Sequence, residues 1–138
     1  MNRFILLITI MVISLCMSFI GCQAAHRADG FYPVADIPEN QIEGKAIVKT
    51  KDFECIVLDT ITDLNEIVIT GKLKPHKIKT FADATERRIG KRIGFVYKDS
   101  VITAPTVNCR IESGTFQINS KDQKLILEIF SSLKKDMR

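Results

Sequence analysis

The sequence predicts an α+β domain in which a small mixed or antiparallel sheet carries two main helices on one face. A hairpin pattern gives the first indication, because alternating apolar residues at 92–97 and 101–104 flank a short polar turn. The second indication is an apolar stripe at helical spacing, from Leu125 to Leu133, that fits a helix packed on a sheet. Strands and helices are therefore both expected in one small domain.

Length and charge limit the classes of function. The chain has 138 residues, which suits one domain once an export signal is removed. Its net charge of +4 is mild, so it favours weak attraction to anionic lipid headgroups and does not indicate a nucleic-acid partner.

The N-terminus has the layout of a secretory signal. A basic start at Arg3 precedes an apolar run at 4–20, and the small residue Gly21 precedes Cys22. The segment 19–22 resembles the lipobox of bacterial lipoproteins, in which the cysteine thiol takes a diacylglycerol and becomes the new N-terminus. We therefore expect a lipoprotein signal peptide at 1–21 and a lipid on Cys22.

Two alternatives to lipidation stay open. The apolar run of about 17 residues is near the lower limit for spanning a bilayer, so a retained transmembrane anchor is one alternative, and ordinary secretion is the other. All three place the domain outside the cytoplasm. The expected lipid anchor places it in the cell envelope, facing the periplasm or the cell exterior. Gln23 is not the Asp that retains such lipoproteins in an inner membrane, which favours the outer membrane in a cell with two membranes.

The next residues divide into a tether and a domain. Residues 22–40 contain Gly30, Pro33 and Pro38 among polar residues, which indicates a flexible tether. The folded domain is expected over 41–138, where short apolar runs begin.

Two cysteines remain for that domain, Cys55 and Cys109. An even pair in an oxidising compartment favours a disulfide, whereas the apolar neighbours of Cys55 favour two separate buried thiols. No Cys-x-x-Cys is present and the chain has only two histidines, so neither a metal site nor a cofactor is predicted.

The first half of the domain is expected to alternate strands with one short helix. Apolar runs at 46–48 and 55–58 indicate two strands joined by a polar turn. Residues 63–70 place apolar side chains on one helical face before Gly71, which predicts a short helix. Residues 72–79 contain a proline within an alternating pattern and indicate an edge-like strand.

The second half contains the clearer signals. Thr80 and Asp83 form a variant of the capping box and Gly90 is suited to a C-cap, which predicts a helix between them. After the hairpin, 106–111 is expected to be extended and 115–118 to form a strand. Further capping residues, Ser120 and Gln123, begin the last helix.

The stretch from Phe81 to the last helix resembles the head subdomain of the first periplasmic region of SecD, a protein-export membrane protein. The shared features are a helix ending in Gly-Lys, an apolar strand, a short turn, a Ser/Thr-Ala-Pro string, a glycine turn, a short strand and a closing helix. They fall here on Phe81, Thr85, Gly90, Lys91, 93–97, Val101 to Pro105, Ile111, Gly114 and Ile118. Departures from the family are Ala84 for Leu, Arg88 for Asn, Asn119 for a common Gly, and a glycine turn reduced to 112–114.

The resemblance implies a binding or adaptor module and not an enzyme. In SecD the head is thought to contact emerging polypeptide, and no catalytic residue defines it. The multi-span region that couples proton flow to translocation in SecD is not found in this sequence, so the expectation is a head domain on a lipid tether. Its implied partners are the membrane, through the lipid, and a polypeptide or envelope protein in export or envelope assembly.

Three residues form a candidate binding edge. Thr103, Ala104 and Pro105 end the predicted hairpin, where an extended peptide can add a strand. The alternative is a structural bulge that ends the hairpin.

Two other functions remain open. One is a structural envelope lipoprotein without an export role, and the other is a small periplasmic hydrolase that would use His76. No nucleophile motif such as Gly-x-Ser-x-Gly accompanies His76, so no catalytic residue and no small-molecule substrate are predicted.

Overall fold

A computed structural model of the chain describes residues 26–138. The predicted signal peptide and Cys22 lie outside the described residues. Among residues 26–138, no helix combines the length and the apolar character needed to cross a bilayer.

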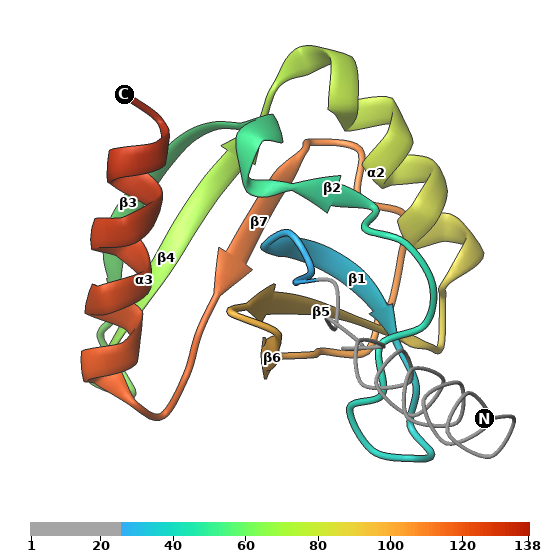
Figure 1. Cartoon of the computed structure of the whole chain (residues 1–138), viewed down its shortest axis with the longest axis horizontal. Helices are drawn as coiled ribbons and strands as arrows, with labels where there is room; N and C mark the ends of the chain where they lie inside the picture. The colour runs from blue at the N-terminus through green and yellow to red at the C-terminus, as the bar shows by residue number, and fades with distance from the viewer. Residues whose placement is uncertain (1–25) are drawn as a thin grey trace, which may run out of the picture.

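The α+β prediction is confirmed, and the strands divide into two antiparallel sheets. The four-stranded sheet has the order β2-β1-β5-β6, with β1 at Gly30–Val34, β2 at Val48–Lys49, β5 at Arg92–Tyr97 and β6 at Ser100–Thr103. The three-stranded sheet has the order β3-β4-β7, with β3 at Phe53–Ile61, β4 at Glu66–Leu73 and β7 at Thr115–Ile118. Figure 1 shows α3, at Gln123–Asp136, beside β3 and β4, and α2, at Pro75–Arg87, on the other side of the view.

The tether prediction for 22–40 is wrong for residues 30–34, which form β1 inside the four-stranded sheet. β1 pairs with β2 on one side and with β5 on the other. Phe31 packs its ring against that of Phe95, with 5.3 Å between the centroids. Burial of this aromatic side chain stabilises an extended conformation that glycine and proline alone do not predict.

The helix predicted at 63–70 is also wrong, because β3 and β4 form a hairpin. The turn between them includes Asn65, whose φ of 49° suits a short polar residue. The β-branched run from Ile67 to Thr70 alternates between the two faces of the sheet, as such residues favour in strands. The strand predicted at 55–58 is present within β3, whereas the strand predicted at 46–48 overlaps β2 at Val48 alone. The two strands belong to different sheets.

α2 begins at Pro75, so the strand predicted at 72–79 and the helix start predicted at Thr80 are both wrong. Proline at the first helical position needs no hydrogen-bond donor, and its fixed φ favours the helix. The predicted end is close to the observed one, since the helix ends at Arg87 and Gly90 has a φ of 80°.

The elements after α2 follow the prediction more closely. β5 and β6 form the expected hairpin, and the turn residues Lys98 and Asp99 have φ values of 47° and 64°. β7 has the predicted bounds. α3 is capped by Asp122 and not by Ser120, because the Asp122 carboxylate accepts the N–H groups of residues 124 and 125.

One core joins the two sheets. The rings of Phe31, Phe53 and Phe116 meet at its centre, and the closest pair, Phe53 and Phe116, has centroids 4.3 Å apart. α3 covers the three-stranded sheet with buried apolar side chains, namely Ile126, Ile129 and Leu133.

Candidate functional site

The predicted binding residues lie at the end of an edge strand. β6 is the outermost strand of its sheet and pairs with β5; no other strand within residues 26–138 pairs with it. In Figure 1, β6 lies at the lower border of the sheet. The register between β5 and β6 shifts between Phe95 and Val96, so the irregularity considered as the alternative is also present.

The backbone beyond β6 is held by polar contacts. The carbonyl of Ala104 accepts the Nε–H of Arg92 at 2.8 Å, and the carbonyl of Pro105 accepts the Ile93 N–H at 3.3 Å. The Thr103 hydroxyl donates to Asn119 Oδ1 at 3.0 Å. These contacts fix the position of the strand end, whereas the β6 backbone itself keeps an unpaired outer side.

An apolar pocket adjoins this strand end. Its volume is about 260 Å³, and it lies between α2, β5, β7 and the chain from 105 to 111, which we call the wall segment. Buried rings of Phe31, Phe81 and Phe116 line it, while Asn108 and Cys109 are among its exposed residues. An apolar cavity of about 150 Å³ accepts benzene, so this pocket has room for one aromatic or branched aliphatic side chain.

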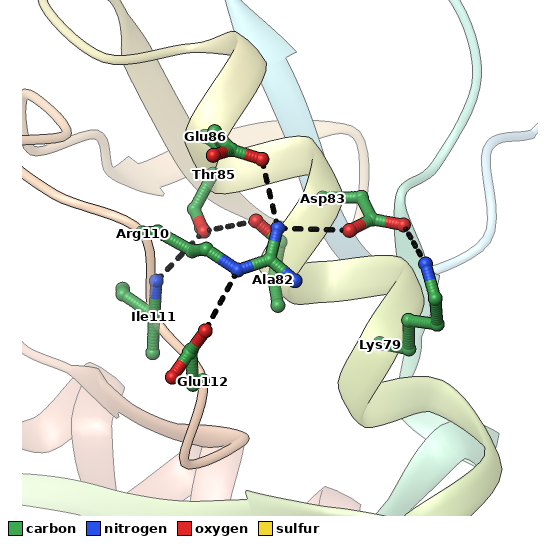
Figure 2. A network of polar contacts seen from close by, with 8 residues as sticks. All are labelled: Lys79, Ala82, Asp83, Thr85, Glu86, Arg110, Ile111 and Glu112. Carbon is green, nitrogen blue, oxygen red and sulfur yellow. Dashed lines mark hydrogen bonds and ion pairs between the residues drawn. The ribbon is translucent and has the colours of Figure 1, made fainter.

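Arg110 ties the wall segment to α2 (Figure 2). Its Nη1 donates to Asp83 Oδ1 at 2.8 Å and to Glu86 Oε2 at 2.9 Å. Its Nε donates to Glu112 Oε1 at 3.0 Å. Lys79 Nζ lies 2.7 Å from the other oxygen of Asp83, so one carboxylate receives two cations.

These ion pairs keep the network charged. The hydrogen bond from Lys79, followed by that from Arg110, holds the pKa of Asp83 below its ordinary value. The hydrogen bonds to Asp83 and Glu112 raise the pKa of Arg110. Because both groups keep their charges at neutral pH, the network suits a structural role and not general acid–base catalysis.

Thr85 supplies a second connection between α2 and the wall segment. Its buried hydroxyl donates to the Ala82 carbonyl at 2.8 Å and accepts the Ile111 N–H at 2.9 Å (Figure 2). The family resemblance includes Thr85 without giving it a role, and the structure gives it a structural one.

The candidate disulfide is absent, since Cys55 and Cys109 are free thiols. Cys55 belongs to β3, at one edge of the three-stranded sheet, whereas Cys109 borders the pocket beside β7, at the other edge. Neighbouring strands lie about 4.8 Å apart, so this separation exceeds the Cα distance of roughly 7 Å that a bridge allows. Both thiols are exposed, which also contradicts the alternative of two buried thiols.

The histidines do not form a site with the pocket. His76 is exposed in the first turn of α2 and is not part of the pocket lining. His26 is exposed and its Nδ1 lies 2.6 Å from Asp99 Oδ2. Within residues 26–138, no group of three His, Cys, Asp or Glu residues is arranged to hold a metal ion.

Comparison with known proteins identifies the family. The family model described as SecDF, P1 head subdomain, matches residues 32–125, so the chain belongs to this family and the predicted resemblance is confirmed. The match includes the end of β1, from residue 32, and the whole β3–β4 hairpin, which the resemblance from Phe81 onward did not cover.

Solved structures of SecDF share the fold. A structure of the membrane component SecDF, which enhances protein export, has a TM-score of 0.66 and 19% identity, with 79% of this chain and 63% of that chain covered. SecDF in a super-membrane-facing form gives the same TM-score and identity, with 79% of this chain and 19% of that chain covered. The chain therefore spans less than two thirds of either relative. No curated protein matches the sequence.

Proposed function

We propose that this chain is an envelope lipoprotein, anchored through Cys22, whose head domain binds extended polypeptide without catalysis. Its role is accessory to protein export or envelope assembly. Family membership supports this proposal, as does the fold shared with a membrane component that enhances protein export. The predicted signal at 1–21 supports the envelope location.

One observation carries the proposed site: the unpaired outer side of β6 leads directly to an apolar pocket. A bound segment adds a strand to β6 through backbone hydrogen bonds, which are independent of sequence. Beyond Pro105, one of its apolar side chains enters the pocket lined by Phe31, Phe81 and Phe116. Backbone pairing supplies tolerance of many sequences, and the pocket adds a preference for segments with a large apolar residue.

The ionisable groups near the pocket favour binding over chemistry. Asp83 on α2 and Arg110 in the wall segment are held in ion pairs and keep their charges at neutral pH. A general base needs a group that gains and loses a proton near the working pH, within reach of the bound substrate.

Cys109 provides a direct test, because its exposed thiol borders the pocket. The full chain in detergent is treated with an alkylating reagent, and the modification of each cysteine is followed by peptide mass mapping. An extended peptide of alternating Leu and Ser should slow alkylation of Cys109 and leave Cys55 unaffected. An unchanged rate at Cys109 would contradict the proposed site.

A matched pair of variants separates pocket binding from general shielding. Thr106→Trp places a large side chain at an exposed pocket residue, and Lys121→Trp places the same side chain at an exposed residue outside the pocket lining. The peptide should protect Cys109 in Lys121→Trp as in the wild type, and should fail to do so in Thr106→Trp.

A further inference from the structure

β3 is a long edge strand that the proposed site does not use. It pairs with β4 over its whole length, from Phe53 to Ile61, and no other strand within residues 26–138 pairs with its outer side. A register shift between Phe53 and Cys55 leaves Cys55 to Ile61 as a regular edge. Edges of this length are templates for adding another strand, and proteins usually shorten or cover them.

Exposed apolar side chains gather on the same hairpin. Val57 is 55% exposed, Leu58 is 39% exposed and Leu64, in the turn, is 63% exposed. They are three of the six large hydrophobic side chains exposed in the described part of the chain, so the hairpin holds half of that set. Exposed apolar residues that cluster in this way indicate an interaction surface, whereas single scattered ones do not.

The hairpin is also acidic, in a chain with net positive charge. Residues 52–71 contain five of the 16 acidic residues and none of the 20 Lys and Arg residues. Glu54, Asp59 and Asp63 are exposed. None of these three forms an ion pair with a residue at 26–138, although Asp83, Glu86, Glu112 and Glu128 do elsewhere.

One of these carboxylates is fixed beside the strand backbone. Asp59 Oδ1 accepts the Thr60 N–H at 2.8 Å, which holds the negative charge next to the β3 edge. A carboxylate that is already fixed loses less conformational entropy when a cation binds to it than a mobile carboxylate does.

We propose that the outer edge of β3 binds an extended polypeptide segment in which Lys or Arg alternates with apolar residues. The segment adds a strand to the three-stranded sheet, and its apolar side chains cover Leu58 on one face. Its cations lie on the opposite face, where their aliphatic stems cover Val57 and their charges pair with the carboxylates of Asp59 and, at the register shift, Glu54. Charge complementarity selects this partner, because an acidic segment is repelled. A second copy joined through the same edge would bring the same unpaired carboxylates together.

This edge and the β6 site can be tested separately, since β3 and β6 belong to different sheets. Cys55 lies on β3 and Cys109 beside the pocket, and both thiols are exposed. An added strand brings its side chains within about 5 Å of the β3 side chains opposite, which shields Cys55.

The experiment uses the full chain in detergent, with alkylation of each cysteine followed by mass mapping. The probe is a peptide of the length of β3 with alternating Lys and Val, and the control peptide alternates Glu and Val. The Lys–Val peptide should slow alkylation of Cys55 about tenfold when its concentration is about ten times its Kd, since only the free fraction reacts. Raised salt should weaken the protection of Cys55. Any protection of Cys109 should be the same for the Lys–Val and Glu–Val peptides, because the proposed β6 site selects an apolar side chain and not a charge.

Variants test the charge contribution. The double variant Asp59→Asn with Glu54→Gln keeps hydrogen-bonding groups and removes two charges. It should weaken the protection of Cys55 by the Lys–Val peptide, and the remaining protection should depend less on salt. Glu39→Gln removes one exposed acid outside the hairpin and should behave as the wild type. Equal protection of Cys55 by the two peptides, or protection by neither, would overturn the proposal. Slow Cys55 alkylation without peptide, together with a dimer in sedimentation, would also overturn it and assign the edge to a second copy.

Discussion

The hydroxyl of Thr85 accepts the backbone N–H of Ile111 at 2.9 Å, and this bond joins α2 to the wall of the apolar pocket. The same hydroxyl donates to Ala82 one turn earlier, so both of its roles are used inside the protein. Together with Arg110 and its acidic partners, Thr85 fixes the wall segment against the helix. The shape of the pocket therefore depends on contacts between α2 and the wall segment.

We expect Thr85→Val to destabilise the fold by about 1–3 kcal/mol, because a side chain of similar shape leaves the partly buried Ile111 N–H without its acceptor. Urea unfolding followed by circular dichroism measures this loss. Thr85→Ser is the control, since it keeps the hydroxyl and should retain most of the stability. A valine variant as stable as the wild type would contradict the structural role inferred for Thr85.

Asp83 should make stability depend on acid pH. Its pKa is held below the ordinary value of 3.8 by hydrogen bonds from Lys79 and Arg110. A lowered pKa in the folded state gives stability that is present above the unfolded pKa and is lost as pH falls through the folded pKa. Urea midpoints measured from neutral pH to below 3.8 should fall less steeply in Asp83→Asn than in the wild type. Parallel curves would contradict the ion pairs of Figure 2 in solution.

Gly71 should not tolerate a methyl group. A Cβ at this position would overlap the ring of Phe116, its partner across β4 and β7. Gly71→Ala should therefore cost about 1–3 kcal/mol from overpacking, although alanine normally stabilises a strand by roughly 0.5–1 kcal/mol relative to glycine. Thermal or urea unfolding shows whether the free energy of unfolding falls or rises in Gly71→Ala. The penalty should shrink in a Phe116→Leu background, and an equal penalty there would exclude the ring as its cause.

Cys55 and Cys109 should both react with an alkylating reagent in protein purified without a reducing agent, since the two thiols are free and exposed. Mass mapping of each cysteine peptide checks this expectation. A bridged peptide pair with two hydrogens missing would show that the two edges of the three-stranded sheet come closer than the fold allows.

The membrane fraction should contain a chain that begins at Cys22 and carries added diacylglycerol and acyl mass. This expectation rests on the lipobox-like segment at 19–22 and the apolar run before it. The intact mass of the protein from the detergent extract shows whether Cys22 is the N-terminus and carries the lipid. A full-length chain that keeps Met1 would exclude lipidation and would leave the N-terminus as a transmembrane anchor or an unprocessed signal.

Sequence patterns predicted the second half of the fold well, because local rules determine it. The β5–β6 hairpin, β7 and the apolar stripe of α3 each follow from alternation, turn residues or helical spacing within a few residues. The same patterns failed between residues 63 and 79. Ile67 and Val68 fit a helix face as well as a strand, and pairing with β3 decides between the two.

Longer-range packing explains the other errors. β1 was assigned to a tether because Gly30 and Pro33 are typical of loops, yet Phe31 packs with rings from β3, α2, β5 and β7. The sequence placed Thr103, Ala104 and Pro105 at the end of a strand, where they lie. It did not reveal the pocket, because Phe31 and Phe116 meet there from distant parts of the chain.

Binding of polypeptide at the β6 edge and pocket is the central claim, and crosslinking in cells tests it most directly. A photoreactive residue at Thr106, an exposed residue lining the pocket, is compared with one at Lys121, an exposed residue outside the lining. The proposal predicts adducts between Thr106 and newly synthesised exported polypeptides, and these adducts should disappear when synthesis is stopped. Equal labelling from Lys121, or no polypeptide adduct from Thr106 in cells that export normally, would contradict it.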